Sequence, residues 1–334
     1  MTLALVVAGW LAGWLLAGRA SRLPKGGACG GTVSVVVPAR DEAARLPRLL
    51  AALAADPPDQ LLVVDDGSTD GTRALAATAG ATVIDSDPPP GWTGKSAACW
   101  TGAQHAGGDV LVFLDADVEP APGFVIALAA DAARTGGLVS AHPWHRVERP
   151  DEHLSATAAL VAVLGAGTGR RPVGFGPAMA IGRSAYLRSG GHGAVRHHVA
   201  EDLALARHVD VPVHAHLARP DELRARMYPG GWRQLAEGWT KNLAAGATTV
   251  PPLRTALVAL WITGCLSALA LGPVAYLLVA VQHAVLLRRI GGYGVVTAVL
   301  WPLPMAAFLL LFLRSAVARA TRRDVAWRGR MVQP

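Results

Sequence analysis

Two long apolar stretches enclose a central stretch of mixed character in this chain. Residues 1–18 are almost uninterruptedly apolar, and the basic residues Arg19, Arg22 and Lys25 follow them directly. A cleaved signal peptide normally carries its positive charge before the apolar stretch, so the reversed order predicts an uncleaved transmembrane anchor. The N-terminus is then expected outside, with the basic flank facing the cytoplasm.

Residues 32–247 have the pattern of an α/β domain. Short apolar runs at 33–37, 61–64 and 110–114 alternate with longer stretches rich in Ala and Leu that have helical character. Continuous apolar runs suit the strands of a parallel sheet that is covered on both faces, and ligands of such sheets gather at the carboxyl ends of the strands. The polar residues at the end of each run are therefore candidate site residues.

The second apolar stretch, residues 255–313, predicts further membrane helices. Residues 255–287 exceed the roughly 20 residues that one span needs, whereas 293–313 form a span of ordinary length. Gly272 and Pro273 predict either a kink in one tilted helix or a short hairpin. The arginines of a basic tail at 314–334 outnumber the pair Arg288–Arg289, which favours a cytoplasmic tail, two crossings in this stretch and three in total. In that arrangement the arginine pair lies outside.

Composition supports a membrane protein of a reducing compartment. The chain has 334 residues, is 52% hydrophobic and has a mean hydropathy of +0.34, which is high for a wholly soluble protein. Its net charge of +7 comes largely from arginines beside apolar runs, so we expect no nucleic-acid partner. The three cysteines, Cys29, Cys99 and Cys265, have no CxxC spacing, so the sequence predicts neither a zinc site nor a disulfide framework.

Acidic residues lie at the ends of the first two predicted strands. The first strand runs into the turn P-A-R-D-E at 38–42, and the second opens into V-D-D-G-S-T-D-G-T at 64–72. Two adjacent carboxylates at the end of a buried strand must be solvated or paired, which favours a functional role for Asp65 and Asp66 over a structural one. Residues 68–70 are more typical of a helix N-cap and turn.

A pair of carboxylates follows the third predicted strand in the segment F-L-D-A-D. Asp115 and Asp117 are one residue apart, so in an extended strand end they would point to the same side and could converge on one cation. Hard oxygen ligands suit Mg²⁺ or Mn²⁺, which can stabilise a diphosphate as a leaving group. The alternative is a simple turn, and the position behind an apolar strand favours the metal site.

The two turns and the carboxylate pair together resemble glycosyltransferase family 2 of the GT-A fold, a Rossmann-like α/β fold. Its signatures are a strand followed by P-x-x-[ND]-E, then V-D-D-G-S-x-D-G-T, then D-x-D. The resemblance implies a nucleotide-sugar donor, a UDP- or GDP-sugar, and a divalent cation at Asp115 and Asp117. It also implies a nucleotide pocket lined by Pro38, Ala39, Glu42, Asp65 and Asp66, with Asp115 contacting the donor.

The segment G-W-T-G-K at 91–95 is similar to a family element whose lysine contacts the donor, in the form found in enzymes that act on hopanoids and carotenoids. A cation beside a diphosphate makes electrostatic sense for Lys95, and the alternative is a solvated lysine at a helix start. The glycine spacing is wrong for a phosphate-binding P-loop.

Further matches to the family place residues on the catalytic and acceptor sides. The pair Glu201–Asp202 matches the E-D signature, in which the aspartate is the expected general base of an inverting displacement, although acids at a helix start also act as caps. The segment 173–192, which contains Gly176 and ends in G-G-H at His192, resembles the acceptor side. Neighbouring histidines at 197 and 198 match no zinc pattern.

The segment 231–242 departs from the Q-x-x-R-W pattern of processive polysaccharide synthases. Gln234 and Trp239 are present, but Gly238 replaces the arginine, which favours the transfer of one or a few sugars. The tryptophans of this segment could either pack at the membrane interface or line the acceptor groove.

The sequence therefore predicts a multi-pass plasma-membrane protein with a GT-A domain at 32–247, flanked by transmembrane helices. The resemblance implies an inverting glycosyltransferase that acts at the cytoplasmic face on a lipid or isoprenoid acceptor, of the carotenoid or hopanoid type. Two alternatives stay open at this point. One is a polyprenyl-phosphate sugar transferase or exopolysaccharide synthase, and the other is a non-catalytic membrane scaffold.

Overall fold

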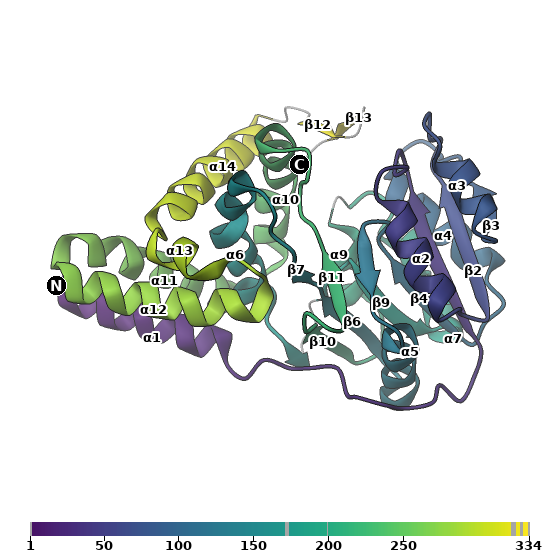
Figure 1. Cartoon of the computed structure of the whole chain (residues 1–334), viewed down its shortest axis with the longest axis horizontal. Coiled ribbons are helices and arrows are strands. Elements are labelled where there is room, and N and C mark those ends of the chain that lie inside the picture. Colours follow the sequence, from purple (N-terminus) through teal and green to yellow (C-terminus); the bar gives the residue numbers. More distant parts are fainter. Residues whose placement is uncertain (1, 171–173, 199, 322–324, 328–329, 333–334) are drawn as a thin grey trace. The chain divides into compact units, whose positions relative to one another are not determined.

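The computed structural model describes residues 2–170, 174–198, 200–321, 325–327 and 330–332 (Figure 1). The chain divides into two compact units. A sheet unit comprises Ser21–Pro143 and Thr168–Ala225, and a helical unit comprises Met1–Ala20, Trp144–Gly167 and Arg226–Pro334. Part of the expected basic tail, including Arg322, Arg323 and Arg328, lies outside the described residues.

The sheet unit is built on a mixed eight-stranded sheet with the order β3-β2-β1-β4-β9-β6-β10-β8. The pairs β2–β3, β1–β2, β1–β4 and β6–β10 are parallel, whereas β9 is antiparallel to both β4 and β6. The strands are β1 (Val33–Ala39), β2 (Gln60–Asp65), β3 (Thr82–Asp85), β4 (Val110–Leu114), β6 (Leu138–His142), β8 (Gly169–Arg170), β9 (Ala178–Gly182) and β10 (Val213–Leu217). A short antiparallel pair joins β5 (Val118–Pro120) to β11 (Leu223–Ala225).

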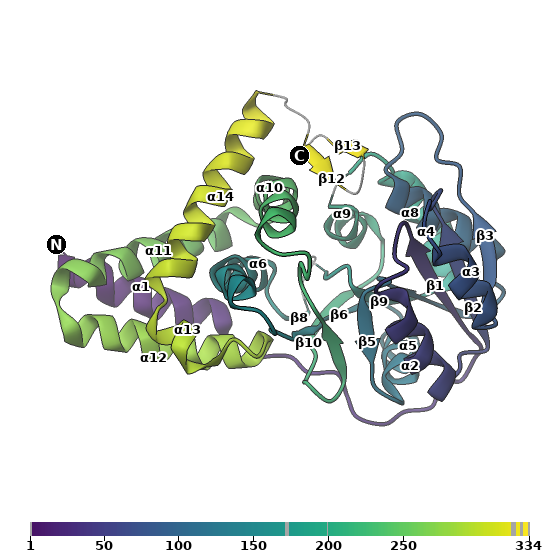
Figure 2. The same ribbon diagram turned by 45° about the horizontal axis from the view of Figure 1, so that its top comes forward.

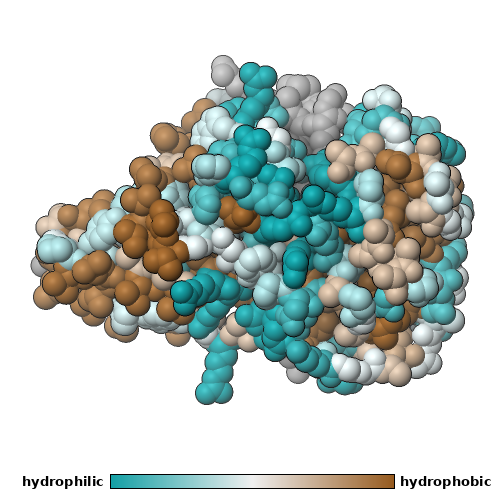
Figure 3. Space-filling model, viewed as in Figure 1, coloured by the Kyte–Doolittle hydropathy of each residue, from teal (hydrophilic) through white to brown (hydrophobic). Residues whose placement is uncertain are grey.

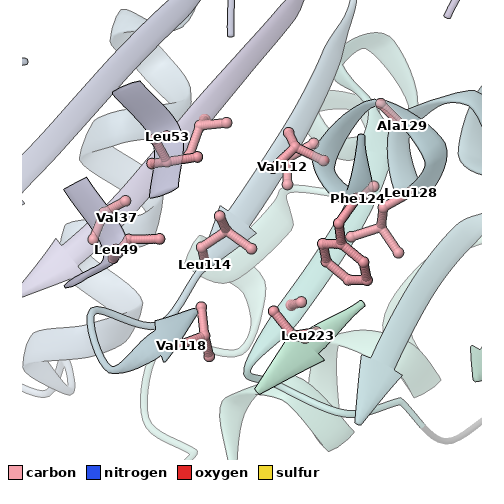
Figure 4. Close-up of a cluster of buried hydrophobic side chains, with 14 of the residues drawn as sticks. Val37, Leu49, Leu53, Val112, Leu114, Val118, Phe124, Leu128, Ala129 and Leu223 are labelled. Atoms are coloured by element: carbon pink, nitrogen blue, oxygen red, sulfur yellow. The ribbon is translucent and has the colours of Figure 1, made fainter. Parts of the chain in front are cut away.

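Helices cover both faces of this sheet, as the continuous apolar runs predict. Successive side chains of a strand point to opposite faces, so Val35 and Val37 belong to one core cluster and Val36 to the other. The first cluster, shown in Figure 4, packs under α2 (Leu46–Ala55), α3 (Thr72–Thr78) and α5 (Phe124–Thr135). The second packs under α4 (Gly94–His105), α7 (Arg183–Arg188), α8 (Gly191–Ala194) and α9 (Glu201–His208).

A glycine sets the distance between α4 and the sheet. A Cβ atom at Gly102 would lie 2.4 Å from Cγ1 of Val36 and 2.9 Å from Cγ2 of Val64. The helix can therefore lie directly on the strands only because this position has no side chain. This close packing fixes the first turn of α4, which carries Lys95, relative to the ends of β1, β2 and β4.

The helical unit contains the apolar helices. Three of them, among the residues that the structure describes, are long and apolar enough to cross a membrane: α11 (Pro252–Leu271), α12 (Pro273–Ile290) and α14 (Pro302–Ala320). The N-terminal helix α1 (Thr2–Ala17) is apolar but has only 16 residues. The unit also contains β7 (Trp144–His145), η1 (Pro150–Ser155), α6 (Ala156–Ala166), α10 (Trp232–Thr249), α13 (Gly294–Val299), β12 (Val325–Trp327) and β13 (Arg330–Val332).

Small residues let α1 pack closely against α11. A Cβ atom at Gly9 would lie 2.7 Å from Cα of Gly264, and one at Gly264 would lie 2.7 Å from Cα of Gly9. Close backbone approach at glycines is the usual way in which apolar helices associate where lipid removes the hydrophobic driving force. Helices α1, α11 and α12 lie side by side in Figures 1 and 2.

The stretch 255–287 is not one tilted helix. It divides at Gly272, whose φ of +106° ends α11, and α12 begins at Pro273. Helix α12 runs back toward the C-terminal end of α1. This direction is shown by Nη1 of Arg289, near the end of α12, which donates to the Gly18 carbonyl over 3.0 Å. Nη2 of Arg254, at the start of α11, donates to the Leu16 carbonyl over 3.3 Å.

The hairpin gives three C-terminal helices that are long and apolar enough to cross a membrane, and the last of them begins at Pro302 instead of near 293. The number of crossings stays a prediction, but the expected place of the arginine pair is wrong. Arg289 lies at the same end of the helices as the basic flank that follows α1, not at the opposite end. The compact units also differ from the expected 32–247 domain, because 144–167 and 226–247 belong to the helical unit.

Apolar side chains remain exposed on these helices. Val274 is 71% exposed, Leu278 50% and Val281 59% along one side of α12. Figure 3 shows apolar atoms gathered where Figure 1 places α1, α11 and α12. Such a continuous apolar surface is typical of a segment that contacts lipid.

Candidate active site

The loops that follow β1 and β2 are bound to each other by hydrogen bonds. The Asp66 amide donates to the Ala39 carbonyl over 2.9 Å, and the Asp41 amide donates to Oγ of Ser68 over 3.0 Å. In return, Oδ1 of Asp41 accepts from the Thr69 amide over 2.8 Å. Asp41 has a φ of +51°, a strained conformation for a residue with a side chain, and this network is what holds it there.

The five residues expected to line a nucleotide pocket gather in these two loops and the strand ends before them. Ala39 pairs with Asp65 across the parallel ladder, and Pro38 precedes Ala39 in β1. The carboxylates of Asp65 and Asp66 are largely buried, each residue being 6% exposed. Asp65 accepts from the Ser68 amide, and Oδ2 of Asp66 lies 3.8 Å from Nη1 of Arg40.

Glu42 is bound differently from this expectation. Its side chain is buried, and Oε2 lies 2.6 Å from Nε of Arg45 on the same turn. The Glu42 amide donates to Oγ1 of Thr72 over 2.7 Å. The backbone of Glu42 thus joins the two loops, and the expected contact of its carboxylate with the nucleotide stays a prediction.

Residues 68–70, which the sequence places at a helix N-cap, do not cap α3 but form hydrogen bonds within and between the loops that precede it. The N-cap position of α3 is Gly71, which has no side chain to accept a bond. Asp70 accepts from the amides of Thr72 and Ala43 over 2.9 and 3.0 Å. Burial is the largest single influence and raises the pKa of the Asp70 carboxyl, but the hydrogen bonds from the Thr72 hydroxyl and from these amides together outweigh it and leave the pKa below its usual value.

Lys95 joins two carboxylates from different parts of the sheet unit. Its Nζ lies 2.7 Å from Oδ1 of Asp115, after β4, and 3.0 Å from Oε1 of Glu201, at the start of α9. Burial by itself would lower the pKa of Lys95, but the negative charges of Asp115, Glu201 and Asp202 hold it well above its usual value. The lysine therefore stays protonated and is the positive charge at the centre of an acidic cluster.

Asp202 is the carboxylate of this cluster whose proton affinity is raised. Burial is the largest cause and the charge of Glu201 the second, and together they raise the pKa of Asp202 to about 6 despite the opposing charge of Lys95. Adjacent acids at a helix start do not explain this arrangement as a cap, because the N-cap of α9 is Ala200. A carboxyl with a pKa close to physiological pH is suited to accept and release a proton.

Gly176 packs directly against Asp202. A Cβ atom at position 176 would lie 2.6 Å from Oδ2 and 3.0 Å from Cγ of Asp202, so no larger residue fits without displacing the carboxylate. The same segment reaches the third strand end, because the Asp115 amide donates to the Pro177 carbonyl over 3.0 Å. Residues 174–177 thus connect Asp115 with Asp202, whereas Val173 and Val199, at the ends of the two motifs, lie outside the described residues.

The carboxylates of the D-A-D segment do not lie on an extended strand end. β4 ends at Leu114, and residues 115–118 form a turn in which the Val118 amide donates to the Asp115 carbonyl over 3.3 Å. Among the described residues, no group of three or more Asp, Glu, His or Cys side chains could hold a metal ion. Two partly exposed carboxylates nevertheless fit Mg²⁺ or Mn²⁺, since these ions retain waters and take further oxygens from substrate phosphates.

His192 lies beneath this cluster and is fully buried, so its expected contact with an acceptor is not supported. The hydroxyl of Tyr186 accepts from the His192 amide over 3.0 Å and lies 2.8 Å from Nδ1 of the ring. Burial, and secondarily the charge of Lys95, lowers the pKa of His192 to about 3. The neutral ring packs edge-on against Phe113, which precedes Asp115 by two residues.

Gln234 and Trp239, expected on the acceptor side, belong to the helical unit. Oε1 of Gln234 accepts from the Gly230 amide over 2.7 Å, and Nε1 of Trp239 donates to Oγ of Ser155 over 3.0 Å. A Cβ atom at Gly238 would lie 2.2 Å from the ring of Tyr228. The ring of Tyr228 thus occupies the space next to position 238, where processive synthases have an arginine.

Comparison with known proteins identifies the family. The family model described as "Glycosyl transferase family 2" matches residues 34–202, which include every carboxylate of the cluster. The chain is a family 2 glycosyltransferase. It is 31% identical to the 4,4'-diaponeurosporenoate glycosyltransferase of Staphylococcus haemolyticus over 90% of this chain and 88% of that protein. It is 33% identical to the enzyme of that name in Staphylococcus aureus, over 89% of this chain and 87% of that protein.

The glycosyltransferase also shares its fold with a solved structure. A mannosyltransferase from Pyrobaculum calidifontis, determined with GDP-Man and Mn²⁺, superposes with a TM-score of 0.58 at 18% identity. The match covers 97% of this chain and 99% of that chain. This similarity shows the GT-A fold of the transferase, and the carotenoid-related relatives show its place within the family.

The sequence did not indicate several residues that shape the site of this glycosyltransferase. Tyr186 holds the ring of His192 in position, and Ser140 holds the 174–177 segment by accepting from the Phe175 amide over 3.0 Å. Tyr186 lies within the segment 173–192 but was not singled out there, and Ser140 lies in none of the motifs. Tyr186 and His192 are only six residues apart, which is a weak sequence signal that the two side chains are in contact. Ser140 is remote in the sequence from residues 174–177 and comes close to them only through the pairing of β6 with β9.

Proposed function

We propose that this glycosyltransferase moves a sugar, with inversion, from a nucleotide-sugar donor to a membrane lipid acceptor of the carotenoid or hopanoid type. The observation that carries the proposal is the acidic cluster around Lys95, in which Asp202 has a pKa near 6 while Asp115 is held 2.7 Å from the ammonium. One carboxyl is thereby suited to proton transfer, and another is suited to the charge of a donor.

The reaction that we propose uses Asp202 as the general base, with Glu201 beside it. An ionised Asp202 takes the proton of an acceptor hydroxyl as the acceptor oxygen forms its bond to the anomeric carbon of the donor. The bond from that carbon to the diphosphate oxygen breaks, and the nucleoside diphosphate leaves with the bonding electrons. An acceptor that is already a carboxylate would need no proton removed, so Asp202 would then only orient it.

Donor binding is assigned to the loops after β1 and β2 and to the D-A-D turn. Pro38, Ala39, Asp65 and Asp66 would line the nucleoside pocket, with Lys95 near the diphosphate. Asp115 and Asp117 would hold a divalent cation, which when bound offsets the charge of the leaving diphosphate. The structural neighbour determined with GDP-Man and Mn²⁺ supports a nucleotide-sugar and cation in this fold.

A lipid acceptor is supported by the names of the relatives and by the apolar helices. The two staphylococcal enzymes are diaponeurosporenoate glycosyltransferases, and such an apolar acceptor resides in a membrane. We propose that the sheet unit carries catalysis, between an N-terminal anchor and C-terminal membrane helices. For the acceptor side we propose Gly176, which lies beside the proposed base, and Gln234 and Trp239 of the helical unit, while the buried ring of His192 supports this side from within the protein.

The orientation that we propose places the catalytic residues in the cytoplasm. The C-terminal ends of α1 and α12 and the start of α11 share one end of the helices, where Arg254 and Arg289 bind to α1 and its following turn. An excess of arginine and lysine marks the cytoplasmic side of membrane proteins. We propose the same side of the plasma membrane for the sheet unit, because its first residue, Ser21, follows the C-terminal end of α1 by only a few residues.

Sugar transfer by the detergent-solubilised full chain tests this function. UDP- and GDP-sugars labelled in the sugar would be offered with Mn²⁺ or Mg²⁺ and an apolar carotenoid carboxylate or hopanoid alcohol. We expect label in the organic extract only with a divalent cation, and its loss in Asp117→Ala but not in Asp210→Ala, an exposed acid after α9. Label that stays in water with all donors and acceptors would refute the proposal.

The second candidate function is transfer to a polyprenyl phosphate or to a growing polysaccharide. The ring of Tyr228 beside Gly238 disfavours the polymer version, because an arginine side chain would collide with it. Adding polyprenyl phosphate in parallel to the carotenoid acceptor decides between the two lipid versions. A polymeric product would identify a synthase.

A further inference from the structure

The ammonium group of Lys95 lies where the charge of a bound cation is expected. Its Nζ is 2.7 Å from Oδ1 of Asp115, the first carboxylate of the D-A-D segment. Both side chains retain access to solvent, since Lys95 is 34% exposed and Asp115 28%. Ligands can therefore reach the ion pair and compete for either partner.

Local structure does not by itself favour a cation at this position. Lys95 lies in the first turn of α4, whose N-cap Thr93 accepts from the Ser96 amide over 3.2 Å. The dipole of a helix disfavours positive charge at its N-terminus. The carboxylates of Asp115 and Glu201, at 2.7 and 3.0 Å, are what keeps the ammonium there.

A divalent cation at Asp115 and the ammonium at its present place are in conflict. Both would share the oxygens of one carboxylate, and two positive charges a few ångströms apart repel each other strongly where solvent is partly excluded. A nucleoside diphosphate resolves the conflict because it brings negative charge that can accept both the ion and the lysine. The lysine side chain is long and flexible enough to move between such partners.

We infer that Lys95 acts as an internal counter-ion, which occupies Asp115 in the donor-free enzyme and moves to the diphosphate when the donor binds. This inference rests on the proposed function of the site. Its consequence is that cation and nucleotide bind cooperatively, so that the enzyme holds a divalent cation weakly until a nucleotide is present. Coupling of this kind is reciprocal, and the cation raises the affinity for nucleotide by the same factor.

Binding of Mn²⁺ alone tests the inference without any turnover. Free Mn²⁺ would be followed by electron paramagnetic resonance during titration of the full chain in detergent, without nucleotide. We expect Lys95→Met to bind Mn²⁺ at least about tenfold more tightly than the wild type, since a close charge pair of this kind is removed. Lys95→Arg keeps the positive charge and should bind Mn²⁺ as weakly as the wild type.

A matched control removes a positive charge elsewhere in the sheet unit. Arg48→Met breaks an exposed ion pair with Glu119, whose N–O distance is 3.0 Å. Its affinity for Mn²⁺ should stay within about twofold of the wild type, because exposed charges are screened. An equal gain in Arg48→Met and Lys95→Met would show a general charge effect and overturn the inference, as would no gain in Lys95→Met.

A second measurement uses the wild type alone and does not depend on the folding of Lys95→Met. The wild type would be titrated with Mn²⁺ in the presence and absence of saturating UDP or GDP. We expect at least about tenfold tighter Mn²⁺ binding with nucleotide, and equal affinities would overturn the inference. If neither nucleotide binds, the proposed donor is wrong, and the Mn²⁺ titration of a folded Lys95→Met variant against the wild type then decides the role of Lys95.

Discussion

Replacing Asp202 by Asn should have opposite effects on catalysis and on stability. The substitution removes a negative charge with almost no change of shape, so the close contact with Gly176 is kept. The variant can neither accept a proton nor repel Glu201. We expect it to be a poorer enzyme and a more stable protein.

The expected size of both effects follows from the position of Asp202. Its pKa rises from 3.8 to about 6 on folding, so the native state binds this proton more tightly than the unfolded chain does. The contribution of Asp202 to the free energy of unfolding is therefore most favourable below pH 4, falls as pH rises from about 4 to 6, and is a constant penalty above that. A shift of this size corresponds to about 3 kcal/mol at most, and solvent access and the shared charge of Glu201 reduce it to about 1–2 kcal/mol.

For an acceptor hydroxyl, loss of the general base should lower kcat by about 10²–10⁴-fold. The wild-type rate should rise with pH through about 6, as Asp202 ionises, and Asp202→Asn should lose this dependence. With a carboxylate acceptor, which has no proton to remove, the substitution should lower kcat much less. The size of the decrease therefore also shows which kind of acceptor the enzyme uses.

The assay combines sugar transfer between pH 5 and 8 with thermal unfolding at pH 7.5. Asp210→Asn, an exposed acid after α9, serves as the control and should change neither quantity. We expect the melting temperature of Asp202→Asn to rise by roughly 1–3 °C. An unchanged melting temperature together with an unchanged pH profile would refute the role that we assign to this carboxyl.

Two further substitutions test the packing around the site and in the membrane helices. Gly176→Ala places a Cβ 2.6 Å from Asp202 and should lower kcat about tenfold or more with little change in nucleotide affinity, whereas Gly182→Ala, where nothing lies within 4 Å, should be neutral. Equal kinetics for the two variants would contradict the positioning role of Gly176. Gly264→Leu should separate α11 from α1 and cost about 1–3 kcal/mol of stability in detergent, measured by thermal unfolding beside Gly246→Ala, which has open space. An unaltered melting temperature would show that the close approach is not needed.

The sequence was sufficient for three of the strands, β1, β2 and β4, and for the ends at which the site residues lie. The alternation along β1 and β4 divides their valines, leucines and phenylalanine between the two faces of the sheet, as a doubly covered sheet requires. Asp65, Asp66 and Asp115 could be located because a strand ends there, and the strand pattern depends only on neighbouring residues. The family, confirmed by the comparisons, was evident from the same local motifs.

The helical unit shows where local patterns failed. Hydropathy marks 255–287 as apolar but does not distinguish a kink from a turn, because both need the same Gly–Pro pair. The close contact of α1 with α11 and the contact of Arg289 with Gly18 select the hairpin. These partners are more than 200 residues apart in the sequence, so no local window contains them.

The chemistry of individual side chains was decided by tertiary structure. The sequence by itself determined which residues carry charge and which strand ends present them. Only the fold placed Lys95 between Asp115 and Glu201, buried His192 beside Tyr186, and set Gly176 against Asp202. A pKa or an ion pair depends on distances and on desolvation, and both arise only when elements remote in the sequence pack together.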